Sequence, residues 1–127
     1  MRDQVLGAWS LVSFELEDLQ GNKEPWGKNA RGQLIYDKSG KMSVSINRDL
    51  DAETSDKFER IFDSILFYSG SFEVKGSEIL HIVENASNPE RIGKKLTRFA
   101  TLNGRDLTLS SPKESFGTAH LVWRKLS

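Results

Sequence analysis

Short segments in which apolar and polar residues alternate make up nearly all of this chain, and turns that contain glycine join them. An all-β chain must protect its edge strands, and closure into a barrel removes the edges altogether. Together with one helix, these segments therefore predict a single all-β domain over residues 1–127, an antiparallel β-barrel. About eight strands are expected, at residues 10–18, 32–37, 41–47, 68–74, 78–84, 94–102, 105–110 and 117–125.

Two of the predicted hairpins have two-residue turns, at 76–77 and at 103–104. A turn of this length fixes the register of the strands on either side. Paired residues share one face of the sheet, so the register also sorts side chains into inner and outer sets. The pairs expected are Val74 with Ile79, Phe72 with His81, Arg98 with Leu109, and Ala100 with Leu107.

Residues 52–66 change period and predict one helix inserted between strands. Its apolar residues recur at helical spacing and form one stripe: Phe58, Ile61, Phe62, Ile65 and Leu66. A helix at this place fits two roles equally well, a lid over the barrel or a plain cover of its end or wall.

The two termini supply a plug for one end of the barrel. Trp9 lies on the first strand and Arg124 on the last, and closure makes these strands neighbours. A guanidinium that stacks on an indole would close that end. A barrel closed at one end is a cup, and a barrel of about eight strands has room for one small ligand.

The overall charge and the missing cysteines exclude several classes of function. Lys plus Arg and Asp plus Glu number 18 each, which argues against nucleic acid or an anionic membrane as the main partner. Without cysteine there is no disulfide, no thiolate catalysis and no zinc–cysteine site. No apolar stretch approaches a membrane span, and no apolar signal segment follows the first residues. We expect a cytoplasmic protein without a cofactor.

The expected inner face is mostly apolar with a few polar side chains, which is typical of a small-molecule pocket. Phe14, Leu34, Val44, Leu109 and Thr118 are among its members. Seven others are the candidate ligand-binding residues: Tyr36, Met42, Tyr68, Phe72, His81, Arg98 and His120.

Arg98 is the most informative of these candidates. Its charge cannot be lost, so an inward guanidinium needs an acceptor. One hypothesis is that Arg98, helped by a tyrosine hydroxyl, binds the carboxylate or other anionic head group of a ligand. The alternatives are an ion pair with a loop Asp or Glu, or a strand bulge that turns Arg98 outward.

His81 and His120 are the only histidines of the chain. They fit acid–base chemistry near neutral pH, but a structural role in hydrogen bonds to tyrosines or water is favoured over catalysis. A metal site would need a third ligand that the sequence does not offer, so none is predicted.

Some apolar side chains fall on the outer face: Phe67, Leu80, Ile82, Phe99, Leu121 and Trp123. An apolar patch on the surface of a small domain suggests contact with a partner, and a homodimer is the simplest case. Packing of the predicted helix against this patch is the alternative.

The order of several motifs resembles the calycin superfamily, and more closely the lipocalin-like domain family. The matching stretches are LGAWSLVSF at 6–14, RGQLIY at 31–36, GKMS at 40–43, YSGSFEV at 68–74, the Asn88-Pro89 pair, Gly93, RF at 98–99, LTL at 107–109 and LVWR at 121–124. The resemblance implies an up-and-down barrel but little about activity.

Three functions fit the sequence. The first is binding of a small, largely apolar molecule, with or without an acidic head group. The second is an isomerase or cyclase that uses the barrel cavity, with His81, His120 or Tyr36 in proton transfer. The third is a filled barrel that acts through its outer apolar face. The sequence shows no nucleophile constellation, phosphate loop or paired carboxylates, so binding ranks above enzymatic activity.

Overall fold

The structure is a computed structural model, and it describes residues 1–50 and 61–126. A short helix, α1 (Arg2–Val5), precedes the strands. The strands are β1 (Gly7–Glu17), β2 (Lys23–Pro25), β3 (Arg31–Tyr36), β4 (Lys41–Asn47), β5 (Ile65–Lys75), β6 (Glu78–Ala86), β7 (Lys95–Asn103), β8 (Asp106–Ser110) and β9 (Thr118–Lys125). A 3₁₀ turn, η1 (Pro89–Arg91), lies between β6 and β7.

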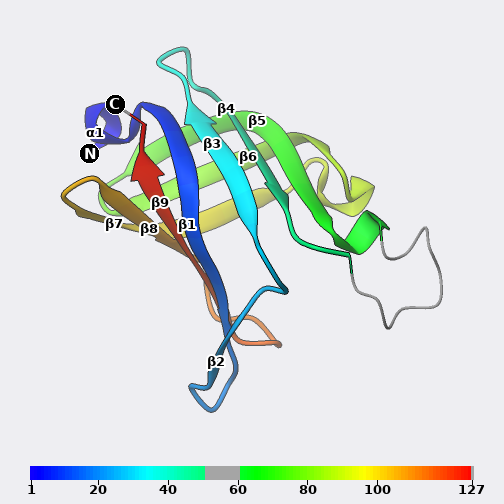
Figure 1. The fold of residues 1–127 in the computed structure, drawn as a ribbon. Helices are drawn as coiled ribbons and strands as arrows, with labels where there is room; N and C mark the ends of the chain where they lie inside the picture. Colours follow the sequence, from blue (N-terminus) through cyan, green and yellow to red (C-terminus); the bar gives the residue numbers. More distant parts are fainter. Residues whose placement is uncertain (51–60, 127) are drawn as a thin grey trace.

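Eight of these strands close into an antiparallel barrel, as the sequence predicts. Neighbours along the chain pair from β3 to β9, while β1 pairs with β3 on one side and with β9 on the other. The long β1 runs between β9 and β3 in Figure 1. The short β2 extends the sheet beside the far end of β1. Among the described residues, no helix is long and apolar enough to cross a membrane.

The hairpin of β5 and β6 has the predicted register, in which Phe72 pairs with His81 and Val74 with Ile79. The register predicted for β7 and β8 is wrong by two residues, because Ala100 pairs with Leu109. The two central turn residues are 104 and 105, and Gly104 has φ +63°. A turn with positive φ only at its first central residue requires the glycine at that place. A shift of two keeps the same face, so Arg98 still points inward.

A bulge interrupts the alternation of β1. The pairing with β9 shifts between Leu11 and Ser13, and Val12 is 47% exposed. Val12 was predicted on the same face as Phe14, and this is wrong. Leu11 takes the inward direction instead, opposite Trp123.

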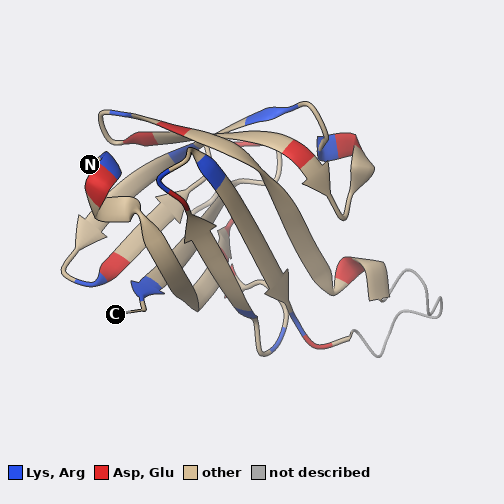
Figure 2. Cartoon of the chain, turned by 90° about the horizontal axis from the view of Figure 1, so that it is seen from above, with Lys and Arg blue, Asp and Glu red and all other residues tan. Residues whose placement is uncertain are grey.

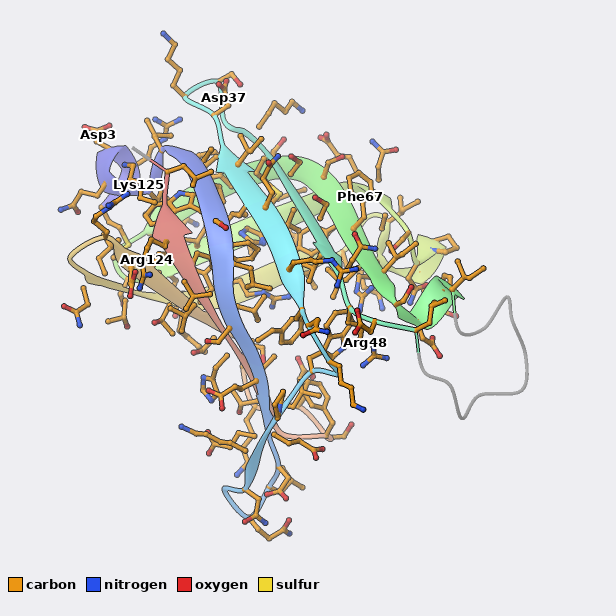
Figure 3. All side chains as sticks on the ribbon, in the orientation of Figure 1. Asp3, Asp37, Arg48, Phe67, Arg124 and Lys125 are labelled. Atoms are coloured by element: carbon orange, nitrogen blue, oxygen red, sulfur yellow. The ribbon has the colours of Figure 1, made fainter. Side chains whose placement is uncertain are left out.

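The closed end of the barrel is formed by Trp9 together with α1. Trp9 is 1% exposed, and its Nε1 donates to the carbonyl oxygen of Val5, which is fully buried. The cation over the indole is Lys125, whose Nζ lies 5.4 Å from the ring centroid. The predicted stacking of Arg124 on Trp9 is wrong. Arg124 follows the inward Trp123, so it faces outward and pairs with Asp106 at 3.0 Å (Figure 3).

The predicted faces of β9 are also wrong, because the loop before it shifts the alternation by one residue. Leu121 and Trp123 face inward, and Trp123 is 1% exposed. Of the predicted outer patch, Phe67, Leu80 and Ile82 are half-buried and Phe99 is 44% exposed. A homodimer through this face stays a prediction.

Most of the predicted helix at 52–66, including Phe58, lies outside the described residues. Its predicted role as lid or cover therefore also falls outside them. Residues 61–63 are helical, but Ile65 and Leu66 belong to β5. The predicted end of the helix is therefore too late.

Acidic and basic residues are interspersed over the strands and loops (Figure 2), in keeping with the zero formal charge.

Candidate cavity site

A cavity of about 380 Å³ lies inside the barrel. Inward side chains of several strands form its apolar wall, including Phe14, Leu34, Val44, Leu66, Leu96, Leu109 and Leu121. Because side chains alternate along a strand, each strand contributes every second residue to this wall. The interior is thus only partly filled by side chains, and a packed barrel without space is not what the sequence encodes.

The cavity opens at the end away from α1. Trp26, Arg91 and Phe116 line it there, and they come from three different connections between strands. Phe116 is 53% exposed, whereas Trp9 at the opposite end is almost fully buried. The loop that carries Phe116 lies near β2 in Figure 1, at the end away from both termini. The barrel is therefore a cup with its mouth at these loops.

Trp26 is held in place at the mouth by two neighbours. It stacks on Phe14 with the ring centroids 4.8 Å apart and the planes inclined by 14°. The guanidinium of Arg48 lies 4.3 Å from its ring centroid. Arg48 is in turn bound through Nε to the carbonyl oxygen of Asp63. The loop after β2 thus presents a fixed aromatic surface to the cavity.

A buried hydrogen-bonded chain of three side chains crosses the inner face. Tyr36 Oη lies 2.5 Å from His81 Nε2, and Tyr68 Oη lies 2.6 Å from His81 Nδ1. The strand register places all three side chains on the same face. Val44 pairs with Tyr68 on one side and with Leu34, two residues before Tyr36, on the other, while His81 pairs with Phe72. His81 and Tyr68 line the cavity, and Tyr36 lies behind them.

Burial sets the protonation of this chain. Burial, and to a smaller extent the positive charge of Arg98, together lower the pKa of His81 to about 3. His81 is therefore neutral at neutral pH. Burial also raises the pKa of Tyr36 and of Tyr68, and Arg98 acts in the opposite direction on both. The two phenols keep their protons.

Arg98 lines the cavity, as the sequence predicts, and is half-buried. Its Nη1 donates to the carbonyl oxygen of the adjacent Thr97 at 3.0 Å. Among the described residues no carboxylate lies within ion-pair distance of it. Apart from this bond and its interaction with the Tyr68 hydroxyl, the guanidinium has donors free toward a cavity that is lined mostly by apolar side chains and also by Glu114.

Arg91 is a second cation of the cavity lining. Asn88 fixes the start of η1, because its Oδ1 accepts from the backbone N–H of Glu90 at 3.1 Å. Arg91 ends the same turn, close enough to lower the pKa of Tyr68. Arg91 is not among the ligand residues predicted from the sequence, because no periodic pattern marks its position. The pair Asn88-Pro89, which indicates a loop, is the one sequence feature that points to this segment.

Trp123 carries an indole N–H without a partner. The ring lines the cavity, and Nε1 has no acceptor among the described residues. Buried N–H groups are nearly always paired, so this one is a donor in need of an oxygen atom.

Of the predicted ligand residues on the inner face, only part lines the cavity. Tyr68, His81 and Arg98 do. The others are buried nearer the closed end and lie outside the lining: Tyr36, Met42 and Phe72. Their contact with a ligand stays a prediction, whereas their place on the inner face is confirmed.

His120 is not on the inner face, and neither is Thr118. His120 Nδ1 lies 2.7 Å from Ser110 Oγ, and its Nε2 lies 2.9 Å from Glu17 Oε1. These bonds join β1, β8 and β9 on the outside of the barrel, while Ala119 and Leu121 line the cavity. The alternation within β9 therefore turns His120 outward, and its predicted inward placement is wrong.

One family model and two solved structures that are similar to this chain agree on the fold. The sequence model of the family described as lipocalin-like domain matches residues 6–126. A lipocalin-like protein from Bacteroides uniformis is 20% identical with a TM-score of 0.53, over 97% of this chain and 99% of that one. A redesigned β-barrel is 9% identical with a TM-score of 0.54, over 99% of this chain and 95% of that one. No curated protein matches the chain. At these identities the two structures show the barrel fold alone.

Proposed function

The chain belongs to the lipocalin-like domain family, and we propose that it binds one small, largely apolar molecule inside the barrel, with an acidic head group at Arg98. The family and the fold are compatible with small-molecule binding and name no ligand. The proposal therefore rests on the cavity and on the side chains that line it.

The size and the walls of the cavity support this function. Its volume of about 380 Å³ lies in the lower part of the range of small-molecule sites, roughly 300–1,000 Å³. The ligand is therefore short. Apolar side chains form most of the wall, and burial of an alkyl chain against them contributes about 0.8 kcal/mol per CH₂ group.

One observation supports an acidic head group on the ligand. Arg98 has no carboxylate within ion-pair distance among the described residues, although Glu114 also lines the cavity, and it faces walls that are mostly apolar. A half-buried guanidinium is stabilised most by a charge-assisted hydrogen bond to an anion.

Binding of octanoate tests the proposal, because this probe combines a short alkyl chain with a carboxylate. Titration at neutral pH, followed by calorimetry and by the fluorescence of Trp26 and Trp123, is expected to show one site per chain. Octanol, which lacks the charge, is expected to bind roughly tenfold to a hundredfold more weakly, as a charged hydrogen bond contributes about 1.5–3 kcal/mol.

A steric variant tells the cavity from the surface. Ala119 lines the cavity, and Ala119→Phe is expected to abolish octanoate binding. Ala8 lies on the outer face of β1, so Ala8→Phe is the matched control and is expected to keep the affinity. Octanoate binding that survives Ala119→Phe in a folded protein would place the ligand elsewhere and contradict the proposal.

An isomerase or cyclase activity is less well supported. A general acid or base works best with a pKa near the operating pH. The pKa of His81 lies at about 3, chiefly because of burial, and burial raises the pKa of Tyr36 and of Tyr68, so none of the three titrates near neutral pH. Binding remains the function that these side chains favour.

A further inference from the structure

The direction of each hydrogen bond in the Tyr36–His81–Tyr68 series follows from the partners of Tyr36, which is its most deeply buried member. Tyr36 is 1% exposed, and its hydroxyl has one partner among the described residues, Nε2 of His81. If His81 donated from Nε2, the proton of Tyr36 would have no acceptor there. An unpaired buried donor costs about 1–3 kcal/mol. Tyr36 therefore donates, and Nε2 of His81 accepts.

The direction of the first bond fixes the second. A neutral imidazole carries one N–H, and Nε2 already accepts, so the proton is on Nδ1. Nδ1 of His81 then donates to Tyr68 Oη at 2.6 Å. Tyr68 cannot return its own proton to His81, and apart from Arg98, which can only donate to it, its hydroxyl has no further hydrogen-bond partner among the described residues. Because Tyr68 lines the cavity, this proton is available to a ligand.

Arg98 and Tyr68 together present donors only. Both line the cavity, and the positive charge of Arg98 reaches Tyr68 strongly enough to influence its ionisation. An amide or alcohol head group brings its own donor, which would find no acceptor between them. A carboxylate brings acceptors alone and satisfies both.

We propose that Tyr36 and His81 hold Tyr68 as a hydrogen-bond donor toward the cavity, beside Arg98, so that the site selects a carboxylate over a carboxamide of the same shape. This inference rests on the proposed function and deepens it, because it names the class of head group and the residues that select it. Tyr68 contacts the ligand, whereas Tyr36 and His81 are positioning residues.

The protonation of His81 is the first readout, and it needs no ligand. The chain has two histidines, so His120→Gln leaves His81 as the only source of imidazole signals in a ¹⁵N-labelled sample. Two-bond ¹H–¹⁵N spectra at neutral pH are expected to show Nδ1 protonated and Nε2 bare. Protonation at Nε2, or at both nitrogens, would overturn the proposed direction of the hydrogen bonds from Tyr36 through His81 to Tyr68.

Selectivity is the second readout. Octanoate is expected to bind at least tenfold more tightly than octanamide to the wild-type protein. Tyr68→Phe keeps the ring, and it is expected to lower octanoate affinity about threefold to tenfold while octanamide changes less. Equal binding of the two probes, or no loss in a folded Tyr68→Phe protein, would overturn the inference. Failure of the wild-type protein to bind octanoate would instead contradict the proposed function, and the state of His81 would still decide the donor chain.

Discussion

Replacing Trp9 by alanine is expected to lower the free energy of unfolding by about 3–5 kcal/mol. Trp9 is the largest side chain at the closed end of the barrel, and it is 1% exposed. The change removes its contacts with Val5 and Lys125 and leaves the carbonyl oxygen of Val5 without the indole N–H. Since whole domains are stable by only about 5–15 kcal/mol, part of the variant is expected to be unfolded at room temperature.

Trp26 provides the matched control for Trp9. It is also a tryptophan packed on aromatic and cationic neighbours, but it is half-buried and lies at the mouth. Trp26→Ala is therefore expected to cost clearly less stability than Trp9→Ala in urea unfolding followed by circular dichroism. Equal losses would mean that the end near α1 is no more tightly closed than the mouth.

Stability is expected to fall by about 3 kcal/mol between pH 7 and pH 4 because of His81 alone. The pKa of His81 is about 3 in the folded protein, against an ordinary value of 6.5. Between these two values the unfolded chain binds a proton that the folded chain does not, so stability rises with pH in this window. The contribution is nearly complete above the unfolded pKa and is lost as the pH falls toward the folded one.

His81→Gln isolates this effect from that of the carboxylates. Hydrogen bonds lower the pKa of Asp18, Asp37 and Asp106, so these groups also remove stability in acid, in both proteins. Urea unfolding at a series of pH values is expected to give a flatter profile for His81→Gln between pH 7 and pH 4. Parallel profiles would show that His81 titrates normally and is not shielded from water.

The strand pairing of this barrel could be predicted where a short turn sets it. The turn at 76–77 places His81 opposite Phe72, and this alone brings His81 to the inner face beside Tyr68. Even a register error of two residues in the next hairpin leaves Arg98 inward, because side chains alternate with a period of two. The polar centre of the site therefore follows from the alternation of strands.

The rest of the site depends on segments that have no such period. The loop between β8 and β9 shifts the alternation by one residue, which exchanges His120 with Leu121 and Arg124 with Trp123. Trp26 and Phe116 reach the cavity from loops, where the sequence offers no rule for the direction of a side chain. The bulge at Val12 likewise has no local pattern in the sequence that marks it.

The central claim is that Arg98 holds the acidic head group of a ligand inside the barrel, and the affinity of Arg98→Met for octanoate tests it most directly. Calorimetry is expected to show a loss of roughly tenfold to a hundredfold for octanoate and little change for octanol. Arg124→Met removes an arginine from the outer face and is expected to keep both affinities. An Arg98→Met protein that is folded and binds octanoate as tightly as the wild type would contradict the account.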